Sequence, residues 1–408
     1  MSSATTRTAT TRTATSRAAT IGVLGETAAD ERRVALDPSA VAALVKSGHA
    51  VLIETGAGKG SNFFDAAYTA AGARIASRKQ VIDDSDALVV VRAPAESLTS
   101  KLRAEQTIIG LLDPFNSLEQ LRDLAERRVT AVAFELLPRT VSRAQSMDAL
   151  SSQASAAGYR AAIVAAEAYG RYLPMMITAS GTATPAKVIV MGTGVAGLQA
   201  IATTRRLGAV VTGYDVRAAS RQEVESLGAT FLTSTIAQGE GSGGYARALT
   251  PEERAAQQEE LATALKSFDV IITTAKVPGR TPPELVSQQT IESLRPGSVC
   301  VDLGSSDRGG NVAGSVPGSR ILTPGGVTII GAGELASDLP ASSSQMYGRN
   351  VVAVIASLMP DGVLAFDSDD EIHRNIVVCT GGRIVNEAVR TALDPKPASA
   401  THEKVHAS

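Results

Sequence analysis

Three glycines, Gly192, Gly194 and Gly197, form the pattern in this sequence with the clearest chemical meaning. An apolar run at 188–191 precedes them, and a run with helical periodicity at 198–207 follows. In such a unit the first glycine permits a tight turn, the second lets the backbone approach a pyrophosphate, and the third allows close helix–strand packing. The free N–H groups at the helix start then face the phosphates. A glycine-rich turn with only a structural role is the alternative interpretation of this motif alone.

A carboxylate, Asp215, ends the next predicted strand (209–214), about 20 residues after the glycines, as the dinucleotide-binding fingerprint requires. It can accept hydrogen bonds from the adenosine ribose hydroxyls, and its charge repels a 2′-phosphate. Arg217 weakens that preference without reversing it. The motif therefore predicts binding of NAD(H) rather than NADP(H), with further contacts at Val195, Ala196, Val216 and Arg217.

A polar segment at 138–153 reads P-R-T-V-S-R-A-Q-S-M-D-A-L-S-S-Q and leads into a predicted long helix, 151–172. It resembles the signature loop P-R-x-S-R-A-Q-S-x-D-x-L-S-S of the NAD(H)-binding alpha subunit of proton-translocating nicotinamide nucleotide transhydrogenases. The resemblance continues in order along nearly all of the remaining chain, through 157–161, 194–201, 226–229, 243–246, 273–275, 278–279, 296–299, 302–303, 309–311 and 343–348.

The resemblance implies which residues hold the nicotinamide ring and its ribose: Arg139, Gln145, Asp148 and Ser151. The loop has one extra residue between its proline and its first serine compared with the family pattern, so either Arg139 or Arg143 can fill the arginine role. Gln145 and Asp148 can instead cap the helix that follows, and capping and binding can coexist.

Four glycines between 239 and 244 exclude a regular helix or strand there and predict a surface loop. The resemblance implies that this loop closes over bound nucleotide with Tyr245 at its tip, which would exclude water from the reacting centre. An ordinary flexible insertion is the alternative. The resemblance also implies nucleotide contacts at Gly244, Thr274 and Ala275.

The implied reaction is hydride transfer from NADH to NADP+ held on a partner subunit, with membrane-embedded subunits coupling it to proton movement. Such a transfer needs no general acid or base, and none of the four histidines lies near the signature loop. No metal-ligand cluster is expected. The family also implies a homodimer, located in the cytoplasm and held peripherally at the inner face of the membrane by its partners.

Two competing functions stay open. Alanine dehydrogenase shares the architecture, but by resemblance it needs a lysine near 90–94 and a histidine near 109–113, and this sequence has neither there. A non-catalytic NAD-sensing subunit is the other alternative, because the sequence has only one dinucleotide fingerprint.

Short apolar strands alternate with helical stretches of about ten residues along the chain, which predicts parallel sheets. We expect two Rossmann-like α/β domains separated by a nucleotide-binding cleft. The expected divisions are a discontinuous N-terminal domain at 20–150 plus 345–395, an NAD(H)-binding domain at 151–344, and tails at 1–19 and 396–408.

The composition agrees with a globular chain of 408 residues: 44% of residues are hydrophobic and the net charge is −2. The near-zero charge and the lack of tryptophan argue against nucleic-acid binding. Two cysteines are too few for a disulfide framework. No apolar run is long enough to span a membrane. Residues 1–18 are of low complexity and predict a disordered tail, with an organelle transit peptide as the alternative.

Overall fold

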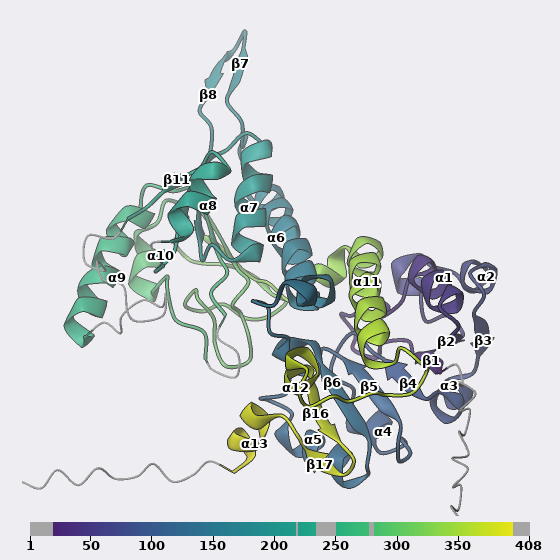
Figure 1. Cartoon of the computed structure of the whole chain (residues 1–408). Coiled ribbons are helices and arrows are strands. Elements are labelled where there is room, and N and C mark those ends of the chain that lie inside the picture. Colours follow the sequence, from purple (N-terminus) through teal and green to yellow (C-terminus); the bar gives the residue numbers. More distant parts are fainter. Residues whose placement is uncertain (1–18, 218, 234–249, 277–280, 395–408) are drawn as a thin grey trace, which may run out of the picture.

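The computed structural model describes residues 19–217, 219–233, 250–276 and 281–394, which fold around two large sheets (Figure 1). Helices cover both faces of each sheet, and one long helix, α6 (Ala149–Ala168), leads from the first sheet to the second. The α/β class with two mostly parallel sheets is confirmed.

The first sheet has the strand order β17-β16-β6-β5-β4-β1-β2-β3. Strands β1 to β6 run parallel, whereas β16 pairs antiparallel with β6 and β17 antiparallel with β16. The C-terminal segment therefore returns to the first sheet. Its strands are β1 (Thr20–Val23), β2 (Ala50–Glu54), β3 (Arg74–Ala76), β4 (Ala87–Val89), β5 (Thr107–Gly110), β6 (Thr130–Ala133), β16 (Val377–Thr380) and β17 (Arg383–Ile384).

The second sheet has the order β11-β10-β9-β12-β13-β15-β14, with only β14 antiparallel. Its central strands are apolar along their length because helices bury both faces. The strands are β9 (Lys187–Met191), β10 (Val210–Tyr214), β11 (Thr230–Phe231), β12 (Val270–Thr273), β13 (Val299–Asp302), β14 (Arg320–Leu322) and β15 (Thr328–Gly331).

The helices around the first sheet are α1 (Pro38–Lys46), α2 (Asp65–Ala70), α3 (Arg78–Asp84), α4 (Glu96–Thr99), α5 (Leu118–Glu126), α11 (Pro340–Leu358), α12 (Glu371–Ile376) and α13 (Glu387–Leu393). Those around the second are α7 (Val195–Arg206), α8 (Ser220–Ser226), α9 (Pro251–Leu265) and α10 (Gln288–Ser293). Helix α11 packs into the core of the first sheet through buried side chains such as Tyr347 and Val351. The exact domain boundaries stay a prediction.

The predicted helix at 151–172 was wrong at its C-terminal end, because α6 stops at Ala168. Tyr169 adopts an extended conformation (ψ 108°), and Pro174 then prevents a return to helical geometry. The following residues form a hairpin that the sequence did not predict, β7 (Met176–Thr178) with β8 (Gly181–Ala183). This hairpin joins neither large sheet and projects away from the rest of the chain (Figure 1).

A buried arginine of the first half, Arg33, contacts α6 and the second half of the chain. Arg33 and Glu31 precede α1 and have side chains only 2% and 0% exposed. The Arg33 guanidinium donates to both Glu31 carboxylate oxygens, to Gln153 Oε1 on α6 (2.9 Å) and to Glu334 beyond β15 (3.2 Å). These contacts hold the first domain against α6 and against the segment that follows β15.

Candidate dinucleotide site

The glycine turn lies between β9 and α7, as the fingerprint predicts. Gly192 has φ +91°, and a Cβ there would lie 2.5 Å from Thr274 Oγ1. A Cβ on Gly197 would lie 1.8 Å from the Gly192 carbonyl oxygen, whereas one on Gly194 would meet nothing within 4 Å. The first and third glycines are therefore required by the packing of the protein itself, and the second leaves its space free. The N-cap of α7 is Gly194, which has no side chain to accept from the first N–H groups of the helix, and this favours binding of an anion there.

Asp215 lies directly after β10 and is held on two sides. Its carboxylate is 7% exposed and accepts hydrogen bonds from the Thr193 amide (2.8 Å) and hydroxyl (3.0 Å). Arg217 donates to it from its backbone amide (2.9 Å), Nε (3.0 Å) and a terminal nitrogen (3.1 Å). Burial raises the pKa of Asp215, but the hydrogen bonds from Arg217 and the Thr193 amide outweigh it, so the pKa lies below its usual value. The carboxylate is therefore charged, and Arg217 already covers it.

A cavity of about 1050 Å³ adjoins the turn, large enough for a dinucleotide. It is lined by the glycine turn and the start of α7, by 214–217 after β10, by 274–276 after β12, and by the first two turns of α6. The predicted contact residues that line it are Arg139, Ser151, Gly192, Gly194, Val195, Ala196, Asp215, Val216, Arg217, Thr274 and Ala275.

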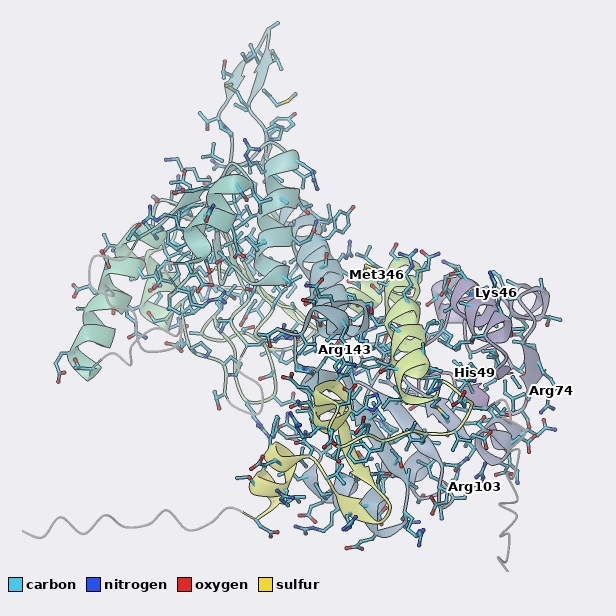
Figure 2. All side chains as sticks on the ribbon, in the orientation of Figure 1. Lys46, His49, Arg74, Arg103, Arg143 and Met346 are labelled. Carbon is cyan, nitrogen blue, oxygen red and sulfur yellow. The ribbon has the colours of Figure 1, made fainter. Side chains whose placement is uncertain are left out.

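Arg139 and Arg143 differ in position. Arg139 is exposed and lines the cavity. Arg143 lies outside its lining and pairs with Asp370 at the start of α12 (2.7 Å). The Arg143 guanidinium holds the pKa of Asp370 below its usual value. Figure 2 labels Arg143 beside α6 and α11, between the two halves of the chain. Of the two candidate arginines, Arg139 is therefore the one that lines the cavity, and its contact with the nicotinamide stays a prediction.

The remaining signature residues have mainly structural contacts. Asp148 is the N-cap of α6, and its carboxylate accepts hydrogen bonds from the Ser151 amide (2.8 Å) and hydroxyl (2.6 Å). Asp148 therefore caps α6, and its contact with the nicotinamide half of the nucleotide stays a prediction. Gln145 is exposed on a 3-10 turn (Ser142–Met147) and, like Asp148, does not line the cavity. Asn350 of α11 fixes the loop by donating to the Ser146 carbonyl (2.8 Å).

Two residues that sequence reasoning did not single out support the site. Thr193 occupies a variable position of the glycine motif, so the motif itself carries no signal for its role. Asn311 accepts from the Ala275 amide (3.0 Å) and donates to the Ala275 carbonyl (2.9 Å), which fixes the loop after β12 at the cavity wall. Gly244 and Tyr245, together with the rest of 239–245, lie outside the described residues, and so do 278–279.

Among the described residues, no group of three or more histidine, cysteine or carboxylate side chains could hold a metal ion. Within the same part of the chain, no helix has the length and hydropathy that a membrane span requires.

The family models that match this chain are the N-terminal domain of alanine dehydrogenase/PNT over residues 22–157 and its C-terminal domain over 161–387. An NAD(P) transhydrogenase subunit alpha polypeptide from Rickettsia prowazekii (strain Madrid E) is 41% identical over 91% of this chain and 97% of its own length. The crystal structure of a transhydrogenase from Sinorhizobium meliloti superposes with a TM-score of 0.80 at 40% identity, covering 90% of this chain and all of the other. An L-alanine dehydrogenase superposes less closely, with a TM-score of 0.75 at 26% identity over 91% of this chain and 98% of the other. The resemblance first seen in the signature loop is thus confirmed along the chain, which belongs to the alanine dehydrogenase/PNT family.

Proposed function

We propose that this chain is the NAD(H)-binding alpha subunit of a proton-translocating transhydrogenase and presents the nicotinamide of NADH to NADP+ held by a partner subunit. One observation supports this most directly. A single cavity is lined both by the glycine turn with Asp215 and by Arg139 and Ser151 of the signature loop. A dinucleotide spanning that cavity has its phosphates at α7 and its ring at the start of α6.

The residues of the cavity bind and orient; they need not move protons. The start of α7 supplies N–H groups for the pyrophosphate, and the ionised Asp215 accepts from the ribose hydroxyls after Arg217 moves aside. Arg139 and Ser151 can donate to the carboxamide or the ribose of the nicotinamide half. The bound nucleotide supplies the hydride, and none of the described residues that line the cavity is a histidine. The chain thus contributes distance and orientation.

A reconstitution experiment tests the proposal. The chain is titrated with NADH by fluorescence and calorimetry, then mixed with a purified transhydrogenase NADP(H)-binding domain, and hydride exchange between NADH and thionicotinamide-NADP+ is followed by absorbance. We expect NADH to bind and exchange to require both proteins. Binding without exchange would favour the NAD-sensing alternative. No NADH binding would refute the proposal.

The same preparation tests the alanine dehydrogenase alternative. A second cavity of about 380 Å³ lies at the carboxyl ends of β1 and β4, where Arg92 pairs with Asp30 (3.1 Å). Lys101 lines this cavity, but within the described part of the chain no histidine does. Incubation with NADH, pyruvate and ammonium should therefore leave NADH unoxidised, and turnover there would overturn the choice of transhydrogenase.

The β7–β8 hairpin supports a homodimer. A two-stranded hairpin alone is marginally stable in water, yet this one and its base expose large apolar side chains: Tyr172 is 62%, Met175 60% and Ile177 76% exposed. Contiguous apolar exposure marks an interaction surface, and we propose that a second copy of the chain covers it. Ile177→Asp should convert a dimer to a monomer in sedimentation velocity, whereas the exposed Val363→Asp, in the loop before α12, should not. A wild-type monomer would contradict the dimer.

Membrane association is proposed to depend on partners, on the cytoplasmic side. The chain should sediment with vesicles that contain the membrane-embedded transhydrogenase subunits and remain in the supernatant with protein-free vesicles. Binding to protein-free vesicles would show that the chain has its own affinity for lipid.

A further inference from the structure

Two helices that pack against each other, α6 and α7, both line the cavity. Ser151 and Ala154 of α6 line it at the end near the signature loop, and Val195 and Ala196 of α7 line it at the glycine turn. The distance between these helices therefore decides how far the ring-binding end lies from the phosphate-binding end.

The helices lie in close contact at Gly158. This residue is buried in α6, and a Cβ added to it would lie 2.1 Å from the carbonyl oxygen of Ala196, 2.8 Å from its carbonyl carbon and 2.9 Å from its Cα. All three atoms are backbone atoms of the first turn of α7, so no side-chain rotation can relieve the overlap. The helices can approach this closely only because position 158 has no side chain.

Any displacement caused by a side chain at 158 should fall on α6 rather than on the start of α7. The α7 turn is fixed by the Gly192–Gly197 contact and by Thr274, whose hydroxyl donates to the Gly192 carbonyl (2.9 Å). Helix α6 instead connects two bodies, because Ala149 packs in the first core and Ala161 in the second. Ser151 lies seven residues from the contact, roughly 10 Å along the helix axis.

We propose that Gly158 is a positioning residue that sets the spacing between the phosphate-binding turn of α7 and the ring-binding start of α6. The inference rests on the proposed function, because it assigns the two ends of the cavity to the two halves of NADH. Gly158 does not itself line the cavity and acts through the helix that carries Ser151.

The test compares NADH with ADP-ribose, which has the adenosine and pyrophosphate but lacks the nicotinamide. For Gly158→Ala, calorimetry should show ADP-ribose affinity within about twofold of wild type and NADH affinity reduced by about tenfold or more. Gly170→Ala is the matched control, since a Cβ there meets nothing within 4 Å. It should leave both affinities unchanged.

Ser155→Val provides a second variant if Gly158→Ala fails to fold. Ser155 lies one turn earlier on the same face of α6, with its hydroxyl 3.5 Å from Gln199 Oε1 of α7. The added bulk should also weaken NADH binding and leave ADP-ribose binding nearly unchanged. The loss of NADH affinity should be smaller than that of Gly158→Ala.

The outcomes separate the inference from the proposed function. Equal loss of NADH and ADP-ribose affinity, or no loss of either, would overturn the positioning role of Gly158. Wild-type protein that binds neither ligand, or binds ADP-ribose as tightly as NADH, would instead refute the proposed placement of the ring.

Discussion

Replacing Asp215 by asparagine changes charge with little change of shape. The carboxylate is 7% exposed and accepts five hydrogen bonds, two from Thr193 and three from Arg217. An asparagine side chain has one acceptor oxygen in place of two. Its NH2 group would face N–H and O–H donors of Thr193 and Arg217, with which it cannot form hydrogen bonds as an acceptor. The variant should therefore free Arg217 and leave the ribose hydroxyls of NADH without a charged acceptor.

The expected loss of NADH affinity in Asp215→Asn follows from these contacts. A hydrogen bond to a charged group contributes about 1.5–3 kcal/mol, against about 1 kcal/mol for a neutral one. Replacing two charge-assisted ribose contacts by neutral ones should weaken NADH binding by about 2 kcal/mol, or about 30-fold. NADPH affinity should rise, because the repulsion of its 2′-phosphate is lost and Arg217 becomes available to that phosphate.

Calorimetric titration with NADH and NADPH at about pH 7.5 measures both effects. Asp269→Asn is the matched control, because Asp269 also accepts from a backbone amide (Lys187, 2.8 Å) and pairs with an arginine (Arg295, 3.2 Å). It lies at the amino ends of β9 and β12, whereas Asp215 follows the carboxyl end of β10. An NADH affinity within about twofold of wild type, or an equal loss in the control, would refute the assignment. The lowered pKa of Asp215 also predicts that its contribution to binding stays constant from about pH 8 to about pH 5.

Further predictions concern the signature loop and the buried carboxyl groups. Arg139→Ala should weaken NADH binding about tenfold, because Arg139 lines the cavity. Arg143→Ala should leave NADH affinity within about twofold, because Arg143 pairs with Asp370 instead. A larger loss of affinity in Arg143→Ala than in Arg139→Ala, measured by calorimetry, would contradict the cavity geometry. Burial raises the pKa of Glu26 from 4.5 to about 7, with a smaller effect from the charge of Glu31. Folding therefore takes up a proton when the pH lies between 4.5 and about 7. As the pH rises through this range, Glu26 increasingly destabilises the folded chain. Glu26→Gln should therefore raise the free energy of unfolding in urea by about 3 kcal/mol at about pH 8 and hardly at all near pH 4.5, and an equal effect at both pH values would contradict this. Glu31→Gln leaves Arg33 buried without its main partner, so it should lower the free energy of unfolding by about 3 kcal/mol in the same urea assay. The double change Glu31→Leu with Arg33→Met removes both charges and should lower the free energy of unfolding by less.

Much of the fold could be predicted from the sequence because its signals are local. Helix α1 begins after Asp37, whose carboxylate accepts from backbone amides of the first turn, with Pro38 at a position where its missing N–H costs nothing. These residues predict an amphipathic helix at 38–46, and the structure has the same bounds. Strand β9 is a continuous apolar run because both its faces are buried. The β7–β8 hairpin had no such signal: its strands are three residues long and mostly exposed, without the alternation that marks a half-buried strand.

The sequence by itself determined the family, the α/β class and the position of the glycine turn. Motif spacing and hydrophobic periodicity are set by residues close together in the chain, so these features can be read without knowing how distant segments pack. Tertiary structure alone decided which arginine faces the cavity, since Arg139 and Arg143 are equivalent in the loop pattern and only the distant Asp370 engages one of them. It also decided that Asp148 caps α6 and that Arg217 covers Asp215. The close approach of α6 and α7 at Gly158 joins residues far apart in the chain, and a contact of that kind depends on how two helices pack.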